Sequence, residues 1–292
     1  MRKAFANSII KISRDPSVFF LTNDLGFMAL EDVRESFGDR FVNAGVAEQN
    51  MIGVAAGLAR EGYKVFAYSI APFVYARPFE QIRNDVCLTN LPVCLVGNGG
   101  GYGYGHMGPT HHALEDCAAM NAIGVRPLVP CFDEDLDSLI QSVNSPSYLR
   151  LGYDCKPENS VLPTFLPWRR ILSGHRGAVA ALGPLAGLAW SAFECLPEEE
   201  RPSVWAVTEL SLSVIPDQFW KEIQSSVLVV LEEHVCAGGL GMNLSYEMLK
   251  QHVQPAQFVH RYAIGYPTKT YGSQNFHRKQ CGLDLESIRS IF

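Results

Sequence analysis

Short apolar runs alternate with longer segments of helical spacing through the first half of the chain. The first helical segment, residues 2–14, is ended by Asp15-Pro16. Buried strands are predicted at 18–22, 40–43, 63–68, 91–97, 126–130 and 148–151. Helices are predicted after Glu48, over 73–90, from near Thr110 and over 133–143. This alternation is typical of a parallel sheet that is covered by helices on both faces.

The second half repeats the alternation on a smaller scale. Its predicted strands are 177–182, 203–207, 227–231 and 257–260, and its helices lie near 185–196, 216–225 and 239–251. Residues 156–175 contain three prolines and no clean periodicity, which indicates a linker. We therefore predict an α/β protein with two doubly wound domains and mainly parallel sheets, at 1–155 and 176–292. A length of 292 residues suits two domains.

The composition narrows the classes of partner. A net charge of −6 argues against nucleic acid or an anionic membrane surface. No run approaches the roughly 18 apolar residues of a membrane span, and Lys11, Arg14 and Asp15 interrupt the N-terminal apolar run, unlike a signal peptide. The eight cysteines are scattered without metal-ligand spacing, which favours free thiols and predicts no metal site in this chain. We expect a soluble, cytoplasmic protein.

The stretch from Phe41 to Arg60 holds the first candidate for chemistry. A short strand passes through Asn43 and Gly45 into an Ala-rich helix with Glu48 in its first turn. The helix dipole favours a carboxylate there, so a capping role is one interpretation. The other is a carboxylate in a buried crevice, because the neighbouring residues are small or apolar. Gly53 and Gly57, four apart, would let another backbone approach closely.

This stretch resembles a family signature. Ala-Gly-Val-Ala-Glu-Gln-Asn-Met (44–51), followed by Gly-Val-Ala-Ala-Gly-Leu-Ala (53–59), is similar to the pyrimidine-binding domain of the transketolase family of thiamine diphosphate enzymes. In that family the Glu hydrogen-bonds N1′ of the cofactor's aminopyrimidine and so promotes deprotonation of the thiazolium C2. The resemblance implies this role for Glu48. Residues 230–241, Val-Leu-Glu-Glu-His-Val-Cys-Ala-Gly-Gly-Leu-Gly, resemble the transketolase C-terminal domain, so both domains are covered.

A glycine-rich loop at 98–108 follows a predicted strand. Its spacing does not match a dinucleotide fingerprint, and it lacks the Gly-Lys-Ser/Thr of a P-loop. Glycine is expected there to let the backbone approach a ligand. The loop ends in Gly-Pro-Thr-His, which resembles a transketolase segment whose His assists proton transfer to substrate oxygens. This implies a catalytic and substrate-binding role for His111, with helix capping as the alternative. His106 is a further substrate-binding candidate, and His112 is predicted to be structural.

Residues 68–83 resemble the family segment whose aromatic side chain stacks on the cofactor pyrimidine. Phe73 is the first choice for that role and Tyr68 the second, with core packing as the alternative. Arg77 corresponds to a substrate-facing Arg of related synthases, or else makes an ordinary ion pair. Arg2 matches an Arg that contacts substrate phosphate in sugar-phosphate transketolases, although a terminal Arg is more often solvated.

The resemblance also implies a second chain. Full-length family members bind the diphosphate through a Gly-Asp-Gly motif, which this sequence lacks. We expect the C-terminal subunit of a split enzyme, paired in an α2β2 heterotetramer with an N-terminal subunit that holds thiamine diphosphate and Mg²⁺ (or Ca²⁺). The complete enzyme would transfer a two-carbon ketol or acyl unit to a sugar-type acceptor. The alternatives are a deoxyxylulose-phosphate-synthase-like or 2-oxo acid dehydrogenase-like subunit, or a non-catalytic regulatory partner.

Three positions depart from the transketolase pattern. Met107 stands where the family has an Asp before Gly-Pro-Thr-His, glycine near Gly99 replaces a substrate-contacting His, and Tyr153 falls where an Arg grips phosphate. Arg150 lies close by, but not at the position of the phosphate ligand. The departures imply a substrate that is less phosphorylated or differently hydroxylated, such as a modified or nucleotide-linked sugar.

Overall fold

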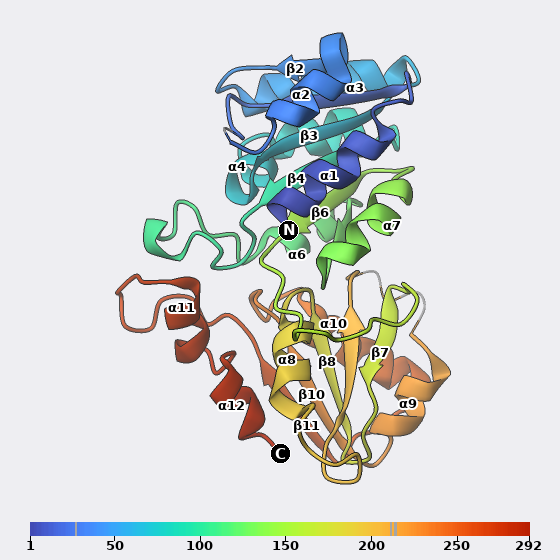
Figure 1. Cartoon of the computed structure of the whole chain (residues 1–292), viewed down its shortest axis with the longest axis vertical. Helices are drawn as coiled ribbons and strands as arrows, with labels where there is room; N and C mark the ends of the chain where they lie inside the picture. Colours follow the sequence, from blue (N-terminus) through green and yellow to red (C-terminus); the bar gives the residue numbers. More distant parts are fainter. Residues whose placement is uncertain (27, 211, 213–214) are drawn as a thin grey trace.

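The computed structural model describes residues 1–26, 28–210, 212 and 215–292. Two α/β units lie one above the other along the longest axis, and the chain passes once from the first to the second (Figure 1). The α/β architecture with mainly parallel sheets is thereby confirmed. Within the described ranges, no helix is long and apolar enough to cross a membrane.

The first unit is built on a six-stranded parallel sheet in the order β2-β1-β3-β4-β6-β5. These strands are β1 (Val18–Thr22), β2 (Phe41–Asn43), β3 (Lys64–Ile70), β4 (Val93–Asn98), β5 (Arg126–Leu128) and β6 (Ser147–Leu151). Successive side chains of a strand face opposite sides of the sheet, so Val65 packs in one core and Phe66 in the other. Because helices cover both faces of the sheet, successive side chains are all buried, which explains the continuous apolar runs of its strands.

Helices cover both faces of this sheet (Figure 1). They are α1 (Arg2–Ile12), α2 (Glu31–Phe37), α3 (Glu48–Arg60), α4 (Ala71–Ala76), α5 (Phe79–Gln81), α6 (Asp116–Ala122) and α7 (Leu136–Gln141), with 3-10 turns at Gly38–Arg40, Gly105–Met107 and Asp133–Asp135 and a π-helix at Ile82–Cys87. The single helix predicted over 73–90 is wrong: it is divided at Arg77-Pro78, because proline lacks an N–H and restricts the residue before it. The helix expected from Thr110 begins only at Asp116.

The second unit has a five-stranded sheet in the order β11-β10-β8-β9-β7, and β7 alone among these strands runs antiparallel to its neighbour. Its elements are β7 (Trp168–Leu172), β8 (Ala178–Leu182), α8 (Leu185–Phe193), β9 (Ser203–Val207), α9 (Asp217–Ile223), β10 (Val227–Leu231), α10 (Leu240–Gln251), β11 (Gln257–Arg261), α11 (Gln274–Gln280) and α12 (Leu285–Arg289).

Strand β7 corrects the predicted linker at 156–175. Its two central arginines interrupted the apolar pattern in the sequence, but each has an acidic partner. Arg169 is buried and pairs with Asp135 of the first unit, while Arg170 pairs with Glu222 of α9. Paired arginines of this kind can occupy a strand without leaving a buried charge uncompensated.

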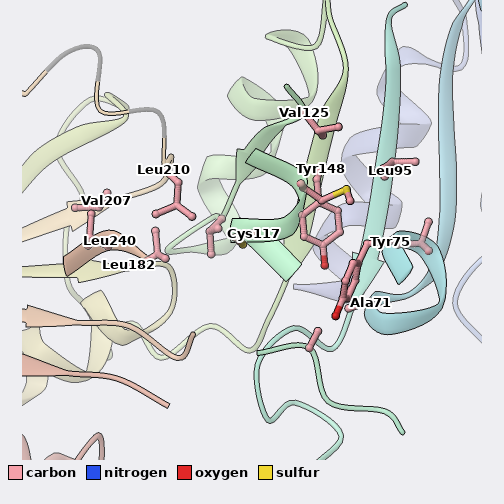
Figure 2. Close-up of a cluster of buried hydrophobic side chains, with 14 of the residues drawn as sticks. Ala71, Tyr75, Leu95, Cys117, Val125, Tyr148, Leu182, Val207, Leu210 and Leu240 are labelled. Carbon is pink, nitrogen blue, oxygen red and sulfur yellow. The ribbon is translucent and has the colours of Figure 1, made fainter. Parts of the chain in front are cut away.

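Buried residues of both units pack together in shared hydrophobic clusters. Cys117 and Val125 of the first unit belong to the same cluster as Leu182, Val207 and Leu240 of the second (Figure 2). Ion pairs Arg126–Glu209 and Arg169–Asp135 cross the same boundary. The relative placement of the two sheets is therefore fixed by packing as well as by charge.

Candidate active site

The loop between β2 and α3 is held by two asparagines. The Asn43 side-chain oxygen accepts from the backbone N–H groups of Asp24 (2.9 Å) and Gly45 (3.0 Å), and Asn23 Nδ2 donates to the Gly45 carbonyl at 3.0 Å. Gly45 has φ +70°, a conformation that glycine adopts without strain. This loop delivers Glu48 to the first turn of α3, at the carboxyl edge of the sheet.

Glu48 is 6% exposed and is bound by a guanidinium. Arg77 Nη1 donates to Glu48 Oε1 at 2.5 Å. Within the part of the chain that the structure describes, no side chain caps α3, so the alternative of a hydrogen-bonded cap for Glu48 is not seen. Residues 46–50 and Arg77 line an open hollow of about 470 Å³ in front of this carboxylate. Glu48 thus combines burial with access from one side.

Arg77 also covers an aromatic face. Its guanidinium carbon lies 3.8 Å from the centroid of the Phe73 ring, a cation–π contact. The Arg77 side chain is 45% exposed, and it stands at the end of α4, directly before the proline that ends this helix. The same arginine therefore engages both the acid and the aromatic ring that were predicted to receive the cofactor.

His111 completes the cluster from the other side of Phe73. The ring centroids of His111 and Phe73 are 5.2 Å apart in an edge-to-face arrangement, and Tyr104 lies 6.0 Å from the histidine ring. His111 Nδ1 lies 2.9 Å from Thr110 Oγ1, which leaves Nε2 for another partner. Glu48, Arg77, Phe73 and His111 form a continuous series of contacts, although they come from three separate segments.

The remaining candidates lie elsewhere. Tyr68 is 2% exposed and stacks on Phe5 of α1, so its burial does not fit the alternative role of stacking on the cofactor. Burial raises the pKa of Tyr68 to about 12, although its hydrogen bond with Arg2 opposes this rise. Arg2 therefore contacts the hydroxyl group of the buried Tyr68. His106 is exposed in the turn at Gly105–Met107.

The neighbouring histidine has a different environment. His112 is buried, with Nδ1 2.7 Å from the Tyr266 hydroxyl and Nε2 3.1 Å from the Gly105 carbonyl oxygen. Desolvation lowers its pKa and favours the neutral ring. The burial and the two polar contacts agree with the prediction that His112 is structural.

The glycine-rich loop packs mainly against the chain itself, which differs from the expectation of a ligand cradle. A Cβ at Gly99 would lie 2.2 Å from the Tyr104 ring, and one at Gly101 would lie 2.3 Å from Glu233 Oε1. A Cβ at Gly105 would meet backbone atoms of residues 272–274, just before and within α11, where Figure 1 shows loop and helix side by side. Glycine here permits contact between the two units.

Sequence reasoning missed the polar network behind this loop. Arg150 is buried, pairs with Asp116 at 2.9 Å and donates to the carbonyl oxygens of Ala113 and Glu233. Arg278 of α11 pairs with the Glu233 carboxylate. Arg150 is therefore a structural residue at the boundary between the units. The signal that could have located it is a charged residue within an otherwise apolar strand.

Two of the positions that depart from the transketolase pattern remain open to solvent. The Met107 and Tyr153 side chains are 57% and 56% exposed. Among the described residues, no three His, Cys, Asp or Glu side chains are grouped so that they could hold a metal ion.

Residues 1–152 match the family model of the transketolase pyrimidine-binding domain, and the chain belongs to the transketolase family. Members of this family are thiamine diphosphate enzymes. The chain is 29% identical to one subunit of the apulose-4-phosphate transketolase of Phocaeicola vulgatus, over 98% of this chain and 94% of that subunit. It is 27% identical to a 1-deoxy-D-xylulose-5-phosphate synthase of Clostridium perfringens over 98% of its own length, but it spans only 48% of that synthase.

The solved structures agree with this classification. A split-gene transketolase, described as an inactive β4 tetramer, superposes with a TM-score of 0.81 at 25% identity, over 99% of this chain and 95% of that one. The chain is the counterpart of the C-terminal subunit of a split transketolase-like enzyme, as the sequence predicted.

Proposed function

We propose that this chain supplies the pyrimidine-binding half of a thiamine diphosphate site in a two-chain enzyme that transfers a two-carbon ketol or acyl unit to a sugar-type aldehyde or ketone. The observation that carries the proposal is the buried Glu48 carboxylate, reachable from one side and adjacent to Phe73, Arg77 and His111. The partner subunit would hold the diphosphate with Mg²⁺ or Ca²⁺, in an α2β2 assembly. The apulose-4-phosphate transketolase relative, itself a subunit, and the split-gene tetramer support a partner and a multimer.

The residues present fit an aminopyrimidine. Such a ring needs an acid for one ring nitrogen and a flat apolar surface for its face, and Glu48 and Phe73 offer both beside an open hollow. In the structure, Arg77 already contacts both of these groups. Because its side chain is 45% exposed, it can leave them at modest cost. Thiamine diphosphate, when bound, supplies an electron sink for carbanion chemistry.

We assign a separate role to each of the four clustered residues. The Glu48 carboxylate, which is 6% exposed, would hold a proton against N1′ of the pyrimidine. Phe73 would orient the ring by contact with its face. His111, whose Nδ1 is engaged by Thr110, presents Nε2 for proton exchange with substrate oxygens. Arg77, which lines the same hollow, would be available to bind a polar group of the substrate once displaced from Glu48.

Binding measurements on the separate and combined subunits test this division. Calorimetry of the purified chain with thiamine diphosphate and Mg²⁺ should show no tight binding, whereas a mixture with a diphosphate-binding subunit of the same family should bind. Tight binding by this chain alone would contradict the partner requirement. Failure of every such mixture, with folded subunits that associate, would contradict the cofactor assignment.

The substrate proposal rests on the three departures at Met107, near Gly99 and at Tyr153. A polar substrate group without its usual partner costs about 1–3 kcal/mol. We therefore propose that xylulose 5-phosphate with ribose 5-phosphate is a poor substrate pair for the reconstituted enzyme. Apulose 4-phosphate is a useful comparison, since the relative from Phocaeicola vulgatus is named for it. Turnover of the ordinary pair at the rate of a housekeeping transketolase would refute this proposal.

A second candidate is a synthase-type reaction, which the similarity to 1-deoxy-D-xylulose-5-phosphate synthase favours. Formation of a deoxyketose phosphate, without exchange of carbon between two sugars, would identify it.

A further inference from the structure

A cysteine, a histidine and a buried acid lie in a row next to the start of α10. Cys236 Sγ lies 3.9 Å from Nδ1 of His260, and the other ring nitrogen of His260 lies 2.6 Å from Glu232 Oε1. Glu232 is fully buried, the His260 side chain is 11% exposed, and Cys236 is partly exposed. The row therefore runs from a buried carboxylate outward to a partly exposed cysteine.

Backbone and glycine positions fix this arrangement. Glu232, directly after β10, accepts the N–H groups of Leu240 at 2.6 Å and Gly241 at 3.0 Å. A Cβ at Gly239 would lie 2.3 Å from Glu232 Oε2, and one at Gly241 would lie 2.4 Å from His260 Nε2. The Gly-Gly-Leu-Gly sequence thus leaves room for the carboxylate and the imidazole. His260 is held opposite Val230 by the parallel pairing of β10 and β11.

The order of the contacts determines the chemistry. A carboxylate only accepts hydrogen bonds, so the His260 Nε2 that faces Glu232 carries the proton. The Nδ1 lone pair then points to Cys236 and can take the thiol proton. A thiol with an adjacent base, oriented by a third group, is the arrangement of an activated nucleophile, because the thiolate is the reactive form.

We propose that Cys236 is a thiol-modification site that takes low-molecular-weight disulfides. The Cys236 proton moves to His260 Nδ1, and the sulfur attacks one sulfur of the disulfide. A new S–S bond forms to Cys236 while the original S–S bond breaks, and the departing thiolate takes the proton from His260. The step is separate from the cluster around Glu48. It lies where Val235 N–H donates to Leu114 of the first unit at 2.8 Å, so the adduct stands beside the boundary between the units.

The other cysteines supply internal standards. Burial raises the pKa of Cys94 to about 12 and that of Cys87 to about 11, and it places those of Cys117 and Cys131 well above the ordinary value. These thiols should react slowly. Cys195 is more exposed than Cys236, so a faster reaction at Cys236 could not be explained by accessibility.

Peptide mapping by mass spectrometry of the full chain treated with limiting oxidised glutathione tests the proposal. At pH 7, Cys236 should form the mixed disulfide at least about tenfold faster than Cys195, because a positioned base accepts the thiol proton as the sulfur attacks. His260→Asn should remove most of this advantage while leaving Cys195 unchanged. Equal rates at Cys236 and Cys195 in the unaltered protein would overturn the proposal, whether or not the variant folds. So would a folded His260→Asn variant that retains the fast rate.

Discussion

Each unit has a buried glutamate between a strand and the following helix, and the surroundings of the two differ. Glu48 stands after β2 at the start of α3, and Glu232 stands after β10 ahead of α10. Glu232 accepts from two backbone N–H groups and from His260, all within its own unit. In the described part of the chain, Glu48 accepts from Arg77, which is 45% exposed. A carboxylate has room for about four hydrogen bonds, so Glu232 is nearly saturated and Glu48 retains capacity.

This contrast separates a structural acid from a candidate functional one. Both residues are buried, so burial by itself does not identify function. The distinguishing features are the number of internal donors and the exposure of the donor side chain. Each of the following predictions tests one part of that distinction.

The largest effect is expected for Glu48→Gln in the assembled complex. An amide cannot hold the proton at the pyrimidine nitrogen as a carboxylate does, and we expect proton–deuterium exchange at the cofactor C2 to slow by about 10²–10⁴. Glu61→Gln, at the other end of α3 and exposed, is the matched control. Unchanged exchange in Glu48→Gln would show that another group is the activating acid.

Glu232→Gln should act on stability instead. It weakens hydrogen bonds to two backbone amides and to His260, and the free energy of unfolding should fall by about 2–3 kcal/mol in urea. Glu247→Gln on α10, whose partner Lys250 is exposed, should change it by less than about 1 kcal/mol. If Glu48→Gln destabilised the chain as much as Glu232→Gln, the proposed distinction between the two acids would fail.

Arg77→Ala should have a smaller effect that separates binding from turnover. Removing the guanidinium frees Glu48 and Phe73, so the cofactor should bind the complex about as tightly or a few fold more tightly, while turnover falls through lost substrate contact. Calorimetry and steady-state kinetics on the same preparation measure the two. Arg83→Ala, an exposed arginine further along the same segment, is the control. Weaker cofactor binding in Arg77→Ala would mean that Arg77 supports the site.

The smallest effect is a pH dependence from His112. Burial lowers its pKa in the folded chain below the ordinary 6.5, so the unfolded chain binds more protons between these two values. The free energy of unfolding should therefore be fully retained above pH 6.5 and should decline as the pH falls below it. His112→Gln, which cannot titrate, should reduce this slope in urea titrations at several pH values. The exposed His175→Gln should not. A slope unchanged in His112→Gln would assign it to other groups, such as His277.

Much of the fold could be predicted from local pattern. Strands β1, β9 and β10 begin and end at the predicted residues. Each is a five-residue segment with at least four apolar residues, and this short length between turn signals favours a buried strand over a helix. Strand β7 could not be predicted, since its arginines find acidic partners far away in the sequence. Helix α11 could not be predicted either, since its buried Arg278 is compensated by Glu233, which lies far away in the sequence. Non-local ion pairs are invisible to periodicity.

The candidate site shows the same division. The resemblance identified Glu48, Phe73, Arg77 and His111, and the structure brings these four together, while their roles remain predictions. What the sequence could not show is that Arg77 binds Glu48 and Phe73 at once. Gly53 and Gly57 are a related case. They are exposed, and a Cβ on either would meet no atom within 4 Å of the described chain, so the close approach expected there is not made within this chain.

The double engagement of Arg77 has a consequence for supply of the cofactor. Under the proposed function, the guanidinium competes with the pyrimidine for Glu48 and Phe73. The apparent affinity for the cofactor is then the intrinsic affinity multiplied by the fraction of chains in which Arg77 is displaced. Copies of this chain made in excess over their partner would then bind this vitamin-derived molecule up to a few fold more weakly than they would without the guanidinium. In unassembled chains Arg77 would remain on Glu48 and Phe73, and more of the cofactor would be left for the assembled enzyme.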